Sequence, residues 1–485
     1  MAARVILPSM SSTITVAVLL ALVSLVQAEK SLLKAPLVIG HRGAPGYRPE
    51  ETVGSYETAF EMGADFLEVD LCMTNDSVLV CRHDCTLGNT TNVASIPQFQ
   101  SKKRLGTYGD SPPVEDWFVE DFTWEELQLL RAVERLPFTR PSNSMWDGLF
   151  PILSLDEYLQ EYFALEEQVP QTFHTLRQIP PASQSSAEFG TCAGLLAQNP
   201  QVQDQSDTAL VYGKKPAVGL YIETKYPSYF RSIGLPMEDQ LLLTLNAAGF
   251  ATICTSPLPV DGLVCPIFLQ SFEDNLKAFR QQTNYPLVQL VGAANEVQLD
   301  TNRTYSELMT DEGLDEIAKW ANGIGPDKTW IIPETVSDNG TIITGEPTDL
   351  ITRAHDRNLL VHPYTFRSDP YFLKGMFNNN PYLEYETFFN LGVDGVFSDF
   401  ADTARVVRDC MFFPPPSSPV IPPAKDSGSD DPWSFFSSTT FWVLVAAIGA
   451  SLVAVIIVVI VVVVRKRKQA QTTYITENDD AFFTA

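Results

Sequence analysis

Short and nearly continuous apolar runs recur along this sequence, and segments with helical spacing separate them. The first run reads APLVIGHR, near residue 35, and the last reads VDGVFSD, ending at residue 399. Strands that are apolar on both faces are typical of parallel sheets covered by helices. The pattern therefore predicts an α/β protein built on a parallel sheet.

A closed (β/α)8 TIM-type barrel is the economical arrangement for about eight such runs over roughly 370 residues. Chemically active side chains recur where the runs end, among them His41, Asp70, Glu223 and Asp399. A barrel with its site at the C-terminal ends of its strands requires this placement. A doubly wound open sheet is the alternative, but it gathers residues from fewer strand ends. The apolar runs are APLVIGHR, ADFLEVDL, SVLVCRHD, AVGLYIETK, LVCPIFLQSF, PLVQLVG, KTWIIP, NLLVHPYTF and VDGVFSD.

Two stretches interrupt the repeat, at about residues 89–147 and 166–215. The first is rich in Pro, Gly and charged residues, and the second contains QIPPASQSSAEFG. Both fall between the second and third expected barrel strands. We expect long insertions after a strand, which cover one side of the site.

The first 28 residues resemble a secretory signal peptide. Arg4 supplies positive charge, TITVAVLLALVSLV is a short apolar run, and VQA ending at Ala28 resembles a cleavage site. An N-terminal membrane anchor is the alternative, for which the apolar run is short.

A second apolar segment, residues 441–464, has no charged residue. As a helix it spans roughly 36 Å at about 1.5 Å per residue, enough to cross a bilayer. The sequence RKRK follows, and basic residues stay on the cytoplasmic side. We expect a single-pass type I membrane protein of the plasma membrane or an endomembrane. Its parts are a lumenal or extracellular barrel at 29–413, a Pro/Ser-rich stalk at 414–440, and a cytoplasmic tail at 465–485. A removed GPI signal is the alternative.

Composition narrows the class of partner and the compartment. The net charge is −26, from 33 basic and 59 acidic residues, which argues against a nucleic-acid partner. All seven cysteines precede the predicted membrane segment, so disulfides are expected, with at least one cysteine left over. Cys254 and Cys265 bracket a short turn and are candidates to pair. Glycosylation sequons begin at Asn75, Asn89, Asn302 and Asn339.

Carboxylates gather at two of the expected strand ends. Glu68 and Asp70 are two residues apart in FLEVDL, so both lie on one face of a strand. Like charges this close need a cation between them or a raised pKa. Glu223 in YIETK offers a third ligand from the next barrel strand, and Glu50 is a fourth candidate. These oxygen ligands predict a divalent cation, Mg2+ or Ca2+.

Two histidines also lie at the ends of expected strands. His41 is followed by Arg42, and His83 by Asp84. Paired imidazoles can act as acid and base near neutral pH. Arg42 and Lys225 are candidates to hold an anion. The combination suits a phosphodiester, whose charge grows in the transition state.

The ordered segments HRG, PEET, EVD and HD, with ETK, QSF, HPYTFR and GVDGVFSDF further on, resemble the glycerophosphodiester phosphodiesterase family. The resemblance runs from about Pro36 to Arg408, and the layout is most similar to the larger, periplasmic-type members. It implies a (β/α)8 barrel with a divalent cation. The implied reaction is cleavage of glycerophosphodiesters to glycerol 3-phosphate and an alcohol.

The resemblance also implies a role for each matching residue. One histidine takes a proton from the attacking oxygen and the other protonates the leaving alcohol, with the order left open. In related enzymes the attacking oxygen can be the neighbouring glycerol hydroxyl. Glu51 departs from the family, which usually has asparagine there, and this predicts an added negative charge near the site. The implied roles are acid and base for His41 and His83; substrate binding for Arg42, Lys225, His362, Tyr364 and Arg367; and metal binding for Glu68, Asp70, Glu223 and Glu50.

Two other functions fit the sequence features. A phospholipase D-like barrel acting on lysophospholipids or sphingomyelin would share the histidines and carboxylates. A non-catalytic surface receptor would keep the barrel and the type I topology. The headgroup preference and the oligomeric state have no signal in the sequence.

Overall fold

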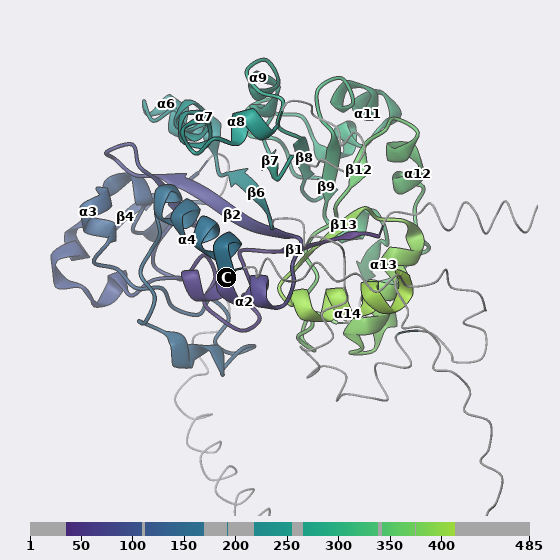
Figure 1. The fold of residues 1–485 in the computed structure, drawn as a ribbon, viewed down its shortest axis with the longest axis horizontal. Coiled ribbons are helices and arrows are strands. Elements are labelled where there is room, and N and C mark those ends of the chain that lie inside the picture. The colour runs from purple at the N-terminus through teal and green to yellow at the C-terminus, as the bar shows by residue number, and fades with distance from the viewer. Residues whose placement is uncertain are drawn as a thin grey trace, which may run out of the picture. The chain divides into compact units, whose positions relative to one another are not determined.

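The computed structural model describes residues 35–108, 112–168, 192, 218–254, 265–337, 342–373 and 375–412. They form a parallel barrel with helices around it (Figure 1). The predicted signal peptide, stalk, membrane segment and tail lie outside the described residues, as does nearly all of the second insertion. Within the described ranges, no helix combines the length and apolar character that a bilayer crossing requires.

Eight parallel strands make the barrel, in the order β12-β9-β8-β7-β6-β2-β1-β13. Backbone hydrogen bonds join the two ends of this order, the segments of β12 and β13. They run from Asp394 N to Val361 O (2.9 Å) and from Phe397 N to Pro363 O (3.1 Å). The predicted barrel is therefore confirmed as a nearly closed one. Its strands are β1 (Leu37–Gly40), β2 (Phe66–Met73), β6 (Gly219–Thr224), β7 (Ile267–Ser271), β8 (Leu287–Val291), β9 (Gly323–Pro326), β12 (Leu360–Val361) and β13 (Gly395–Ser398).

Two of the apolar runs are not barrel strands. The run SVLVCRHD contains β3 (Leu79–Cys81), which pairs antiparallel with β2 as a hairpin outside the barrel order. The run KTWIIP begins with a 3-10 turn, η7 (Lys328–Trp330), and the strand is the preceding GIGP of β9. A Cβ at Gly323 would lie 2.8 Å from Leu360 O, and one at Gly325 would lie 2.7 Å from a Leu290 methyl. Close packing between strands thus requires glycine here and removes the apolar signal.

Helices follow the barrel strands and cover the outside of the sheet (Figure 1). The first of them, α2, begins where Thr52 caps it by accepting a hydrogen bond from Ser55 N. The helix α13 begins with Pro381 in its first turn and ends at Gly392, which has φ 95°. The helices are α2 (Val53–Glu61), α3 (Trp124–Leu127), α4 (Leu155–Gln168), α6 (Pro227–Ser232), α7 (Met237–Ala247), α8 (Phe250–Ile253), α9 (Leu276–Arg280), α10 (Tyr305–Leu308), α11 (Asp311–Ile317), α12 (Leu350–His355), α13 (Pro381–Leu391) and α14 (Ala401–Phe412).

The first predicted insertion lies between β3 and α4, as expected. It consists of short elements rather than a helical layer, and Trp124–Leu127 is its α-helical turn, fixed by a capping box from Thr123. A second small hairpin, β10 (Glu334–Val336) with β11 (Ile342–Thr344), follows β9, and η8 (Gly375–Phe377) precedes α13. The other insertion elements are η1 (Val93–Ser95), η2 (Pro97–Lys102), β4 (Arg104–Gly106), β5 (Val114–Asp116), η3 (Val119–Asp121) and η4 (Asn143–Trp146).

Aromatic side chains fill the interior of the barrel. Tyr221 stacks on Phe268 with ring centroids 4.8 Å apart and meets Phe397 edge-on at 4.9 Å. His362 belongs to this layer, because it is fully buried and its Nδ1 lies 2.9 Å from the Tyr221 hydroxyl. The barrel is therefore closed below its mouth by packed rings, as in other barrels of this kind.

Three disulfides link cysteines of the chain: Cys72–Cys85, Cys192–Cys410 and Cys254–Cys265. The predicted pairing of Cys254 with Cys265 is confirmed. Cys81 is the residual cysteine, and it is buried. The Cys72–Cys85 bridge ties β2 to the loop that carries His83 and so restrains that loop.

Candidate active site

Three carboxylates meet at the C-terminal end of β2 and β6. Glu68 and Asp70 point to the same side of β2, and Asp70 pairs in register with Glu223 on β6. One ligand oxygen from each of the three lies within 4.8 Å of the others, and all three residues are buried. The predicted cluster is thus assembled by strand register alone.

Two cations neutralise part of this cluster. Lys225 Nζ lies 2.7 Å from Glu223 Oε1 and 3.2 Å from Asp70 Oδ1. Arg42 has φ 57°, an uncommon conformation for a residue other than glycine, and its backbone N–H donates to Glu68 Oε2 at 2.7 Å. Its guanidinium Nε lies 3.3 Å from Asp70 Oδ2. Arg42 and Lys225 therefore place positive charge directly beside the cluster.

The pKa values of the three carboxyl groups in the cluster shift in different directions. Burial raises the pKa of Glu223 to about 8, with Asp70 adding to the rise and Lys225 opposing it. Burial and the Asp70 charge also raise the pKa of Glu68 well above its usual value. Burial acts in the same direction on Asp70, but Lys225 and His83 hold its pKa below the usual value. Full ionisation of the three groups thus needs more positive charge than Lys225 and Arg42 bring.

The cluster fits a hard divalent cation. Its donors are carboxylate oxygens, which Mg2+ and Ca2+ prefer. Both carboxylate oxygens of Asp70 and Oε1 of Glu223 are buried and accept no hydrogen bond of good geometry, although Lys225 is near. A cation there would use these oxygens and supply the missing charge.

Glu50 is not part of the cluster, which corrects its prediction as a fourth metal ligand. Both of its oxygens accept hydrogen bonds from Arg135, Oε1 at 2.5 Å and Oε2 at 2.7 Å. Its Oε2 also accepts one from Arg42 Nη1 at 3.2 Å. Although burial opposes it, the charges of Arg135 and Arg42 lower the pKa of Glu50 below its usual value. Glu50 therefore orients the guanidinium of Arg42 rather than binding a cation beside Asp70.

His41 follows β1 directly and lies beside the residue after β13, because these two strands are paired. Its Nδ1 is 2.6 Å from Asp399 Oδ1. The other oxygen of Asp399 accepts hydrogen bonds from Arg140 at 2.6 Å and from Arg367 at 3.1 Å. Burial and the Arg42 charge lower the pKa of His41 to about 4, against the opposing effect of Asp399. Asp399 thus fixes the orientation of the imidazole through Nδ1.

His83 has an equivalent arrangement on the other side of the cluster. Its Nδ1 is 2.6 Å from Asp84 Oδ1, and Asp84 Oδ2 accepts a hydrogen bond from Arg135 at 2.6 Å. Desolvation, with the charges of Arg42 and Lys225, holds the pKa of His83 well below its usual value. Each histidine therefore has a carboxylate at Nδ1, and each carboxylate has an arginine behind it.

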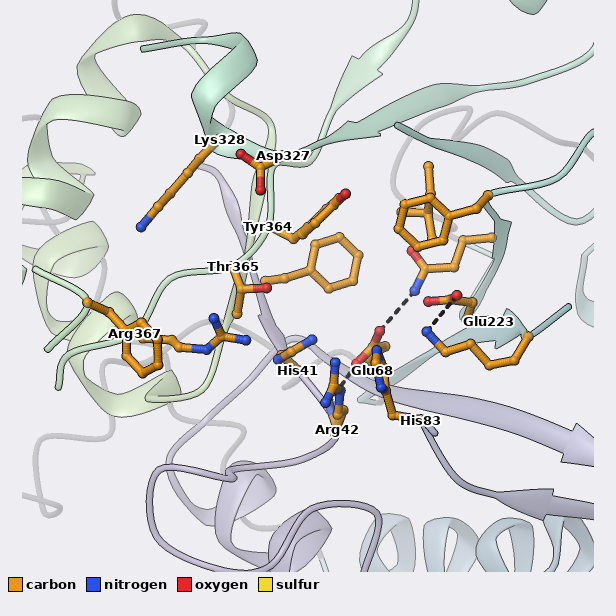
Figure 2. A pocket seen from close by; sticks show the side chains of 16 residues that line it. His41, Arg42, Glu68, His83, Glu223, Asp327, Lys328, Tyr364, Thr365 and Arg367 are labelled. Carbon is orange, nitrogen blue, oxygen red and sulfur yellow. Dashed lines mark hydrogen bonds and ion pairs between the residues drawn. The ribbon is translucent and has the colours of Figure 1, made fainter. Parts of the chain in front are cut away.

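A cavity of about 300 Å3 opens over the cluster and both histidines (Figure 2). Figure 2 shows His41, His83 and Glu68 grouped at one end, with Arg367, Lys328 and Asp327 farther along the same pocket. The lining residues are His41, Arg42, Glu68, His83, Glu223, Lys225, Gln270, Phe272, Leu290, Asp327, Lys328, Tyr364, Thr365, Arg367, Phe372 and Phe397.

Two residues near the site do not lie where the sequence predicts. His362 does not line the cavity, because it lies in the ring layer inside the barrel, whereas Tyr364 and Arg367 of the same segment do line it.

Glu51 is fully buried and also absent from the lining of the cavity. It accepts hydrogen bonds from the Tyr56 hydroxyl and from Asp70 N, and burial and the Asp70 charge raise its pKa well above the usual value. Glu51 therefore supports β2 and does not add the negative charge to the pocket that its position suggests.

Several groups that shape the site carry no clear signal in the sequence. Asp399 is visible as a strand-end residue, but nothing local marks it as the partner of His41. Arg135 and Arg140 come from the first insertion, where no periodic pattern exists. Lys328 follows β9, whose glycines conceal the strand. The insertion is held at the site by Asn143, whose Nδ2 donates to Glu134 and to Pro45 O, at 3.0 Å in each case.

The chain is similar to several known proteins. The model of the glycerophosphoryl diester phosphodiesterase family matches residues 41–403. The chain is 36% identical over 373 residues to glycerophosphodiester phosphodiesterase GDPD6 of Arabidopsis thaliana, covering 75% of this chain and 84% of that protein. It is 26% identical over 391 residues to a glycerophosphodiester phosphodiesterase of Haemophilus influenzae, covering 76% and 88% respectively. A crystal structure from Silicibacter pomeroyi matches 79% of this chain and 98% of its own, at 19% identity and a TM-score of 0.46.

Proposed function

The chain belongs to the glycerophosphoryl diester phosphodiesterase family, and we propose that its pocket hydrolyses glycerophosphodiesters with a divalent cation and two histidines. The products are glycerol 3-phosphate and an alcohol. The observation that carries this proposal is the convergence of His41, His83 and the Glu68–Asp70–Glu223 cluster on one cavity.

In the proposed mechanism, Arg42 and Lys225 bind the phosphate beside the carboxylate cluster. Glu68, Asp70 and Glu223 would hold the cation, which polarises phosphate oxygens and offsets the negative charge that grows in the transition state. Lys225 pairs with Asp70 and Glu223 and also lines the cavity, so a phosphate bound there would lie next to it.

The two imidazoles move the protons. Each Nδ1 is held by a carboxylate, so each Nε2 faces the reaction. One Nε2 accepts the proton from the attacking oxygen, which is the neighbouring glycerol hydroxyl or water. The other acts as the imidazolium, protonated on both ring nitrogens, a form that the negative charge of the bound phosphodiester favours. It donates its Nε2 proton to the oxygen of the leaving alcohol as the P–O bond breaks. With the glycerol hydroxyl as nucleophile, water opens the resulting cyclic phosphate in a second step.

A substrate panel tests the proposed function. We expect purified full-length protein to release glycerol 3-phosphate from glycerophosphocholine, glycerophosphoethanolamine or glycerophosphoinositol in the presence of Mg2+ or Ca2+. Lysophosphatidylcholine and sphingomyelin serve as the competing substrates. Turnover of the lipids without turnover of the deacylated diesters would overturn the assignment in favour of a phospholipase D-like activity.

We also propose that the barrel works outside the cytoplasm. Three disulfides suit an oxidising compartment, and the sequon asparagines Asn75, Asn89 and Asn302 are exposed. Treatment of protein from its native cells with an N-glycosidase is expected to lower its apparent mass. An unchanged mass, together with reduced cysteines in the isolated protein, would contradict this location.

A further inference from the structure

Two arginines of the first insertion bind the aspartates that contact His41 and His83. Arg135 Nη1 donates to Asp84 Oδ2, and Arg140 Nη2 donates to Asp399 Oδ2, both at 2.6 Å. In each case the other oxygen of the carboxylate contacts Nδ1 of a histidine. We propose that Arg135 and Arg140 are positioning residues for the hydrolysis, so that the insertion completes both proton-transfer pairs. The inference rests on the proposed function and assigns the insertion a part in it.

Arg140 is built into the barrel mouth. It is 5% exposed, and its Nη1 donates to Pro45 O at 2.9 Å in the loop before α2. Its guanidinium also bonds Asp369, with Nη2 to Oδ2 at 2.7 Å and Nε to Oδ1 at 3.1 Å. One buried cation is thus shared by Asp369 and Asp399, so the Asp399 carboxylate is held in a single orientation toward His41.

Arg135 serves two groups of the site. Besides Asp84, it holds Glu50 through two hydrogen bonds, and Glu50 in turn accepts a hydrogen bond from Arg42. A change at Arg135 therefore reaches both His83 and the predicted phosphate contact at Arg42. Arg140 reaches His41 without a contact to Arg42, and this difference separates the two arginines experimentally.

The physical effect is orientation together with charge. A carboxylate fixed by a second cation keeps the Nδ1 proton on the histidine and aims Nε2 at the substrate. The comparable partners behind metal-binding histidines are typically worth about 10- to 100-fold. The charged groups facing His41 are Arg42, Asp399 and Arg367. Arg140 acts on His41 through Asp399, whose pKa it lowers despite burial. Without Arg140, Arg367 compensates less of the Asp399 charge, and the remaining negative charge favours the imidazolium.

The test compares variants of the purified full-length enzyme on glycerophosphocholine. For Arg140→Gln we expect kcat to fall about 10- to 100-fold with KM nearly unchanged. The limb of its kcat/KM profile that reports His41 should move to higher pH, because protonation of His41 becomes easier. That limb is the acid limb where His41 is the base and the alkaline limb where it is the acid. Arg140→Lys keeps the charge and should recover part of kcat and a wild-type limb. For Arg135→Gln we expect kcat to fall and KM to rise together.

Arg104→Gln is the matched control, since Arg104 lies on the same insertion and pairs with Glu120 and Asp121 away from the cavity. Its kinetics should equal those of wild type. Should Arg140→Gln fail to fold, a lowered kcat in folded Arg140→Lys supports the role. Unchanged kcat and pH profile in folded Arg140 variants would overturn the positioning role while the enzyme remains active. Absence of glycerol 3-phosphate with wild type would instead overturn the proposed function, and this role with it.

Discussion

His83→Ala is expected to lower kcat on glycerophosphocholine by about 10²- to 10⁴-fold, the usual range for loss of a general acid or base. The side chain lines the cavity and its Nδ1 is held by Asp84, so the variant loses a proton-transfer group that is already oriented. Alanine leaves Arg42 and Lys225 in place, and KM should change much less than kcat. Initial rates of glycerol 3-phosphate formation at saturating substrate measure the effect.

His355→Ala is the control for that variant. His355 lies on α12, is 41% exposed at its side chain, and pairs with Asp394 on the outside of the barrel. We expect wild-type turnover from it. Near wild-type turnover from folded His83→Ala would exclude His83 as acid or base.

Glu223→Gln is expected to abolish most of the activity through loss of the cation. Loss of a residue that supports a metal ligand can lower metal affinity by about 100-fold. Loss of the ligand itself should lower it at least as much. Glutamine keeps the shape of the side chain and removes a carboxylate oxygen that would bind the cation. The fold should therefore persist while the metal site fails.

Thermal unfolding distinguishes loss of the cation from loss of the fold. A scan should show that Mg2+ or Ca2+ raises the unfolding midpoint of wild type but not of Glu223→Gln, because a ligand stabilises only the state that binds it. Asp315→Asn, an exposed carboxylate paired with Arg357, should respond to the metal as wild type does. Equal metal stabilisation in wild type and Glu223→Gln would contradict the assignment of the cluster.

Much of the barrel and of its central site was predictable from the sequence, for a physical reason. Parallel strands bring their C-terminal ends to one edge, so any side chain placed there meets the others. Glu68 and Asp70 share a face because strands repeat every second residue, and register then brings Glu223 beside Asp70. The acids, bases and cations of β1, β2 and β6 follow from these local rules.

Other features depend on packing that local patterns do not encode. The strand β9 is GIGP because a neighbouring carbonyl and a leucine methyl leave no space for a Cβ. Glu50 looks like a ligand in the sequence, yet Arg135 from a distant segment holds it. His362 lies at a strand end and still points into the ring layer, because Tyr221 offers it a hydrogen bond inside the barrel.

Hydrolysis is expected to depend on a cation held by the Glu68–Asp70–Glu223 cluster. The most direct measurement is the rate of glycerol 3-phosphate release from glycerophosphocholine after EDTA treatment, followed by titration with Mg2+ and separately with Ca2+. We expect the treated enzyme to be inactive and the rate to return with one of the two ions as it fills a single site. Full turnover by metal-free enzyme would contradict this dependence.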